Sequence, residues 1–208
     1  MAIGDFQRAL ADMTLDARLA AAVRDRGAGA LDGYALTERE RHRLMTVSRQ
    51  DGMSVNCSLA RANRFGAIHD AFTMTCVLLQ SQLRDLLDEL WSRRRPDNYQ
   101  LAGEEAAFAA LVESRLADGT LDAPYLAEVF RYERICWDLA MELRLCDRTA
   151  MEGRRRTTRF LHDPGALLDA LSRYQLPPAD VPADDYTVTV LVRNGDLVAE
   201  WDEAVPTS

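Results

Sequence analysis

Apolar residues recur at helical spacing over the first two thirds of the chain, from Asp5 to about Cys146. Apolar positions three and four residues apart form one face of an amphipathic helix. Two such stripes come first: Phe6, Ala9, Leu10 and Met13, and then Leu15, Leu19, Ala22 and Val23. They predict two antiparallel helices that end before the loop at Gly27 and Gly29.

Further helices are predicted from capping signals and from the same periodicity. Thr37 and Glu40 have the spacing of a capping box, so a helix should start near Glu38 and end near Asp51 and Gly52. Periodic segments predict helices over 53–65, over 68–90 as one or two helices, and over 104–116. Pro124 precedes the longest periodic segment, over 125–145.

Beyond Gly153 the pattern changes to the alternation typical of strands. It predicts a strand over 156–161, a helix over 164–174 and strands over 186–192 and 197–201. Asn194 and Gly195 join the last two strands as the tight turn of a hairpin. The sequence thus predicts an α+β protein with an all-α multi-helix domain over 1–150 and a small β-α-β-β domain over 151–208.

Glu133 stands out within the predicted helix over 125–145. It lies on the same face as six apolar residues: Leu126, Val129, Phe130, Trp137, Ala140 and Met141. A buried carboxylate needs a cation or several hydrogen-bond donors. Arg61 and Arg64 are candidate partners, and we expect a structural ion pair between Arg64 and Glu133. A catalytic acid or base is the alternative interpretation of Glu133.

Composition and charge narrow the function classes. The net charge of -8 over 208 residues disfavours a general binder of nucleic-acid backbones, so we do not expect a nucleic-acid partner. It has neither the apolar run of a membrane span nor the basic start of a signal peptide, and a cytoplasmic location is expected. The four cysteines show no CxxC pairing and should be free thiols.

Residues typical of catalysis are sparse. The three histidines form no ExxH or HExxH pair, and no P-loop, dinucleotide fingerprint or GxSxG motif occurs. We therefore expect no catalytic residue, no metal site and no cofactor of the chain's own. A stand-alone enzyme in which Cys57 or Cys76 pairs with His42 or His69 is a weaker alternative.

Two features could serve binding. Arginine clusters lie at 93–95 and at 154–156 with Arg159, either as solvated surface or as sites for acidic peptides or phosphates. A three-stranded sheet also has two edges to which an extended peptide can add, unless helices or loops cover them. The expected receiving edge is 157–161, with Thr157, Arg159 and Leu161, or 197–201, with Leu197, Ala199 and Trp201.

Two segments carry a family resemblance. SVNCSLARANRFGAIHDAFTMTCVLL and the later APYLAEVFRYERICWDL resemble a bacterial family labelled as a DNA-binding domain, whose members accompany multinuclear non-heme iron enzymes. The match covers about half the chain. The residues that correspond to the family pattern are Arg64, Phe72, Leu78, Leu79, Tyr125, Leu126 and Glu133. The domain order also resembles partner subunits of methanobactin-type and thiaglutamate-type systems.

The resemblance implies a noncatalytic partner subunit in peptide natural-product (RiPP) biosynthesis. Such a subunit binds the iron enzyme as a heterodimer and recruits a ribosomally made precursor peptide through its leader, for oxidative modification. The iron then belongs to the enzyme. The alternative function is a DNA-binding transcriptional regulator, with a basic surface at Arg39, Arg41 and Arg43 or at 154–159.

Overall fold

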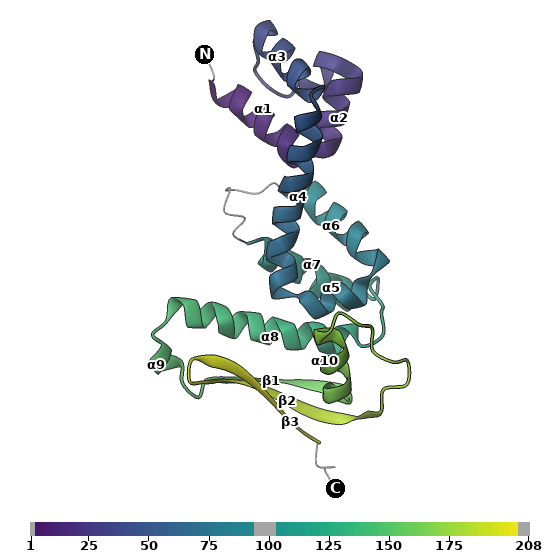
Figure 1. Ribbon diagram of the computed structural model, residues 1–208, viewed down its shortest axis with the longest axis vertical. Coiled ribbons are helices and arrows are strands. Elements are labelled where there is room, and N and C mark those ends of the chain that lie inside the picture. Colours follow the sequence, from purple (N-terminus) through teal and green to yellow (C-terminus); the bar gives the residue numbers. More distant parts are fainter. Residues whose placement is uncertain (1–2, 94–102, 204–208) are drawn as a thin grey trace. The chain divides into compact units, whose positions relative to one another are not determined.

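The computed structural model describes residues 3–93 and 103–203. The chain forms two compact units, Met1–Gly66 and Ala67–Ser208. Helices dominate, and a three-stranded antiparallel sheet follows near the C-terminus, as Figure 1 shows. This arrangement confirms the predicted α+β class.

Four helices and a short 3-10 turn build the first unit. Their bounds are α1 (Ile3–Leu15), α2 (Ala17–Arg26), η1 (Gly27–Leu31), α3 (Glu38–Ser48) and α4 (Asp51–Ala71), whose last turn belongs to the second unit. The capping box predicted at Thr37 and Glu40 is present at the start of α3. Met13, Val23, Leu31 and Leu44 are fully buried in the core of this unit.

The helix α4 differs from the prediction. The helix break predicted near Asp51 and Gly52 is present at 49–50, between α3 and α4. The helix end predicted near Phe65 is absent, because one helix of 21 residues runs from Asp51 through Gly66 to Ala71. A Cβ added at either glycine would meet no atom within 4 Å, so neither glycine marks a close approach or a turn. A glycine in a helix costs about 1 kcal/mol relative to alanine, which the rest of a long helix can offset.

The second unit continues with helices and ends with the sheet. The helices are α5 (Thr73–Leu79), α6 (Ser81–Arg93), α7 (Glu104–Ala117), α8 (Leu126–Leu145), α9 (Arg148–Met151) and α10 (Pro164–Ser172). The strands are β1 (Arg155–His162), β2 (Ala183–Arg193) and β3 (Asp196–Glu203), in the spatial order β1-β2-β3. The short helix α9 was not predicted from the sequence. Of the predicted arginine cluster at 93–95, positions 94 and 95 lie outside the described residues.

The helix α8 packs on both sides. Its first side contacts α5, where Phe72 packs against Phe108, Phe130 and Trp137 with ring centroids 5.7 to 6.2 Å apart. Its second side contacts β1 and β2, where Tyr132 meets Phe160. The predicted boundary near residue 150 therefore falls inside one compact unit, because the sheet buries its apolar face against α8.

The two faces of the sheet differ. Val188, Val190 and Val192 of β2 are buried on the face toward α8, together with Phe160 of β1. Figure 1 shows α8 along this face. Thr157 and Arg159 of β1 have the opposite alternation and are exposed. Among the described residues, no helix covers that outer face.

Candidate functional site

The outer edge of β1 presents backbone groups that no strand pairs. Val192 N donates to Arg154 O at 2.8 Å. Because hydrogen-bonded pairs alternate in an antiparallel ladder, Arg156, Thr158 and Phe160 are the residues that bond to β2. The N–H and C=O groups of Arg155, Thr157, Arg159 and Leu161 then point away from the sheet. These groups form the outer edge of β1, which no strand pairs.

The edge of β3 follows from its turn. Asn194 and Gly195 both have positive φ, 55° and 80°, as the predicted two-residue hairpin requires. Arg193 and Asp196 pair across this turn, so every second residue from Leu197 directs its backbone outward. Both predicted receiving sets, Thr157, Arg159 and Leu161, and Leu197, Ala199 and Trp201, therefore have their backbone groups at an edge of the sheet. That a peptide binds there stays a prediction.

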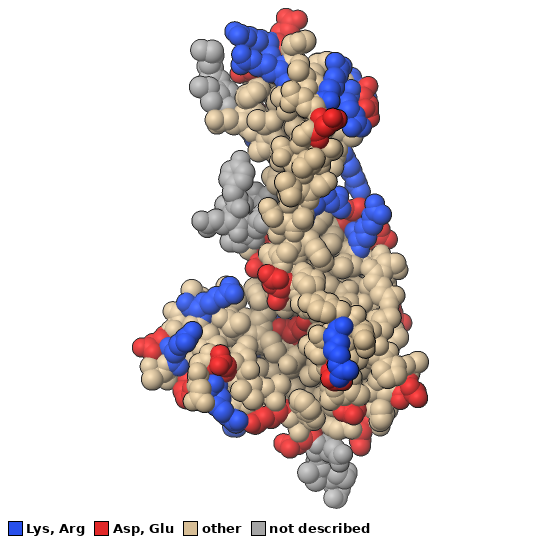
Figure 2. All heavy atoms as spheres, in the orientation of Figure 1, with Lys and Arg blue, Asp and Glu red and all other residues tan. Residues whose placement is uncertain are grey.

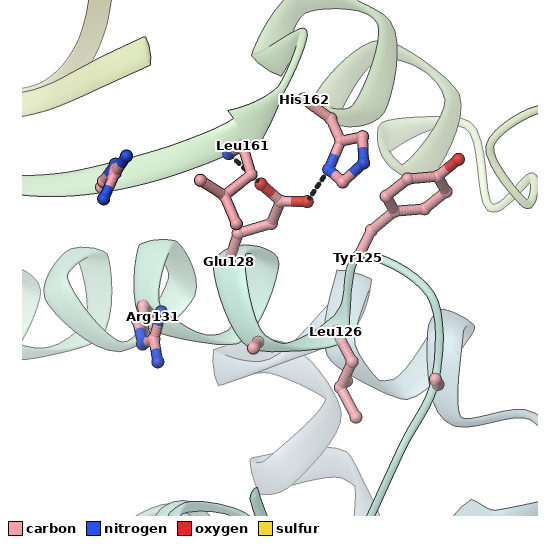
Figure 3. A pocket seen from close by; sticks show the side chains of 9 residues that line it. Tyr125, Leu126, Glu128, Arg131, Leu161 and His162 are labelled. Carbon is pink, nitrogen blue, oxygen red and sulfur yellow. Dashed lines mark hydrogen bonds and ion pairs between the residues drawn. The ribbon is translucent and has the colours of Figure 1, made fainter. Parts of the chain in front are cut away.

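Glu128 closes one end of the β1 edge. Its carboxylate accepts a hydrogen bond from Leu161 N at 2.6 Å, and its other oxygen lies 2.7 Å from Nδ1 of His162. Figure 3 shows the Glu128 side chain pointing from α8 to these two residues. An extended segment added to β1 can thus reach Arg159 but meets an occupied N–H group at Leu161. No sequence signal used above had singled out Glu128.

A hollow of about 290 Å³ adjoins this end of the edge. Tyr125, Glu128 and Arg131 line it from the start of α8, and Arg159, Leu161 and His162 line it from β1. We call it the edge pocket. Tyr125 has a positive φ of 64° at the N-cap of α8, and its hydroxyl donates toward the carbonyls of Pro178 and Ala179 at 3.1 Å. These contacts hold the Tyr125 ring against His162, with ring centroids 4.8 Å apart.

Most arginines near β1 already have acidic partners. Arg154 and Arg156 pair with Glu142, Arg156 also with Asp138, and Arg159 with Asp185. Figure 2 shows basic and acidic side chains interspersed over the face in view. The arginine cluster predicted at 154–156 and Arg159 is therefore largely neutralised, which weakens its capacity for phosphates.

Glu133 is buried where the sequence placed it, on the side of α8 toward α5. Its carboxylate accepts hydrogen bonds from Met74 N and Thr75 N, each at 2.7 Å, at the first turn of α5. Burial raises the pKa of Glu133 to about 7, although these hydrogen bonds lower it. Arg64 lies in the first unit and Glu133 in the second, so the ion pair between them stays a prediction.

The cysteines are free thiols, and two candidates for a nucleophile are buried. Burial raises the pKa of Cys76 to about 12 and also raises that of Cys57, whose Sγ donates to Met13 O at 3.3 Å. A thiol is a nucleophile only as the thiolate. The environments of Cys57 and Cys76 thus act against the chemistry that the thiol-enzyme alternative requires.

This environment leads to a labelling prediction. In the native protein at pH 7.5, iodoacetamide should modify the exposed Cys146 first and leave Cys76 unmodified on the same timescale. Peptide mass spectrometry after timed quenching measures both sites, and the same reaction in 6 M guanidinium is the control. Equal rates for Cys146 and Cys76 in the native protein would contradict the buried, protonated state of Cys76.

Within residues 3–93 and 103–203, no three His, Cys, Asp or Glu side chains come together in a group that could hold a metal ion. In the same residues, no helix has both the length and the apolar character to cross a membrane.

A second hollow, of about 420 Å³, lies in the first unit between α2 and the start of α4. Arg24, Arg49 and Cys57 are among its lining residues, and Arg24 pairs with Asp25. The described residues of the first unit form no strand, so this unit offers no strand edge of its own. The edge of β1 with the edge pocket is therefore the stronger candidate site.

Comparisons with models of protein families, with curated proteins and with solved structures found no match to this chain. Its class is defined by its own geometry. It is an α+β protein in which a helix, α8, packs between a helical core and a small antiparallel sheet with an open edge.

Proposed function

We propose that the chain is a noncatalytic partner subunit that binds a multinuclear non-heme iron enzyme and recruits a ribosomally synthesised precursor peptide for oxidative modification. The observation that carries the proposal is the open β1 edge beside the edge pocket. An extended peptide added to such an edge gains main-chain hydrogen bonds, and a neighbouring pocket selects among its side chains. The small β-α-β-β part is then the peptide-receiving part.

The iron-enzyme half of the proposal rests on the resemblance of 54–79 and 123–139 to partner subunits. Several residues that carry the resemblance lie together in the second unit. Phe72, Leu78, Leu79 and Leu126 are buried there, and Glu133 bonds to the start of α5. The residues that carry the resemblance thus lie where α5 packs against α8, and α8 in turn packs against the sheet.

The DNA-binding alternative receives less support from the surface. Arg41 pairs with Asp32, and three of the four arginines at 154–156 and 159 have acidic partners. Phosphates would have to displace these carboxylates, in a chain with a net charge of -8.

Co-expression tests the proposal. The tagged full chain is produced with the iron enzyme and the short precursor peptide encoded beside its gene. Expected are co-elution of chain and enzyme in size-exclusion chromatography, at least two iron ions per enzyme in metal analysis, and a rise in anisotropy when the chain meets the labelled precursor. Enzyme without the chain should modify the precursor at a rate lower by about tenfold or more, as loss of a recruiting site predicts.

Three results would overturn the proposal. One is that no such genes lie beside this one. Another is that the chain elutes apart from the enzyme. The third is that the enzyme modifies the precursor equally fast without the chain. Modification of the precursor by the isolated chain would show instead that the chain is itself an enzyme.

A further inference from the structure

Two arginines beside the β1 edge have no acidic partner. Arg131 lies one turn after Glu128 on α8 and lines the edge pocket, and Arg155 begins β1. Both are exposed, and neither forms an ion pair with any residue that the structure describes. All other arginines of β1 and its lead-in are paired, as shown above. In an acidic chain, the open edge therefore carries two available positive charges.

The β3 edge has the opposite character. Asp196, Glu200 and Asp202 lie along β3, and only Glu200 of the three has a described arginine partner, Arg193. Both edges offer backbone groups, but their charges differ in sign. A charged peptide would therefore bind to one edge and be repelled by the other.

We infer that the β1 edge, and not the β3 edge, receives an extended acidic segment of the peptide, whose carboxylates pair with Arg131 and Arg155. The inference rests on the proposed function and specifies its site and the chemistry of its ligand. Backbone groups of Arg155, Thr157 and Arg159 hold the segment, and Glu128 limits it at Leu161 because the Leu161 N–H is already bonded.

The geometry also sets the spacing of the acidic residues. Arg155 alternates with the residues that face α8, so it lies on the outer face of the sheet, whereas Arg131 belongs to α8 itself. Successive residues of an added strand point to opposite faces. The two carboxylates should therefore be an odd number of positions apart in the peptide.

Three labelled peptides test the charge requirement. Each has about nine residues of alternating threonine and valine, with two positions three apart occupied by glutamate, glutamine or lysine. Anisotropy titrations with the full chain at low salt should show the glutamate peptide binding at least about tenfold more tightly than the glutamine peptide, since charge-assisted pairs are the stronger ones. The lysine peptide should bind most weakly.

Variants locate the site. Arg131→Gln with Arg155→Gln should remove the preference for glutamate, whereas Arg144→Gln should leave it unchanged. Arg144 is a matched control because it is exposed on the same helix and also has no ion pair among the described residues. Thr157→Pro removes an edge N–H without touching the ladder and should weaken binding about tenfold or more, and Ala199→Pro on β3 should have no effect. Circular dichroism checks that each variant is folded.

Several outcomes overturn the inference and leave the proposed function standing. These are equal affinity for the glutamate and glutamine peptides, an unchanged preference in the double arginine variant, or a loss of binding in Ala199→Pro but not in Thr157→Pro. A concentration-dependent dimer that blocks the peptides would assign the edge to a second copy and also overturn it. Failure of the proposed function can be distinguished from failure of this inference, because the co-expression experiment tests the function and the peptide titrations test the inference.

Discussion

Phe72→Ala is expected to lower the free energy of unfolding of the second unit by about 3 to 5 kcal/mol, the usual cost of deleting a buried phenylalanine. Phe72 is fully buried, and its ring packs against the rings of Phe108, Phe130 and Trp137. Its removal leaves a cavity at the junction of α5 and α8. Because α8 also packs against the sheet, we expect the loss of stability to extend to the β1 edge.

The measurement is urea unfolding followed by tryptophan fluorescence. All three tryptophans, Trp91, Trp137 and Trp201, lie in the second unit, so the signal reports on that unit alone. Phe72→Leu is the matched control and should cost less, because it keeps most of the apolar volume. A loss below about 1 kcal/mol in Phe72→Ala would show that the aromatic cluster does not hold the unit together.

The second large effect is a pH dependence that Glu133 creates. Burial raises the pKa of Glu133 to about 7, above the usual value for a glutamate. A carboxyl with a raised pKa in the folded state keeps its proton there longer than in the unfolded chain. Its contribution to stability is present at pH values below about 4.5 and is lost as the pH rises toward 7.

Glu133→Gln isolates this contribution, because glutamine resembles the protonated acid and does not titrate. The unfolding free energy of the native protein minus that of Glu133→Gln should fall by about 2 to 3 kcal/mol between pH 5 and pH 8, since one pKa unit corresponds to about 1.4 kcal/mol. All other ionisable groups are the same in both proteins, so their contributions cancel in the difference. Urea titrations at four pH values measure it.

Ionisable groups near Glu133 do not contribute to the measured pH dependence. Burial raises the pKa of Cys76 to about 12 and that of Cys136 to about 11, and it also raises the pKa of Tyr132, so all three stay neutral from pH 5 to 8. A difference that stays constant over this range, or grows with pH, would contradict the raised pKa of Glu133.

Local signals made much of the fold predictable. The Thr37 capping box and the Asn194–Gly195 turn are short-range chemistry, and both occur where the sequence placed them. The alternation in the C-terminal part gave the strands, and with them the residues at the edges. The extent of α4 was not predictable from glycine positions, because a long helix tolerates a glycine whose surroundings are open.

Glu128 was missed because only one apolar stripe of the helix was considered, and one stripe does not reveal contacts with distant elements on the other side. On the helical wheel it lies opposite the apolar face of Glu133, which favoured an exposed position. A second stripe was present, however: Tyr132, Ile135 and Leu139 follow Glu128 at helical spacing and pack toward the sheet. A helix with two apolar stripes is buried on two sides, and this pattern could have identified Glu128.

The unpaired arginine at the start of β1 has a consequence for the protein at high concentration. Two copies that joined their β1 strands antiparallel, centred on Arg155, would place the two unpaired Arg155 side chains directly opposite each other. Like charges directly opposite each other destabilise a strand pair. The positive charge that we infer binds an acidic peptide at the β1 edge therefore also disfavours self-association of the protein through that edge.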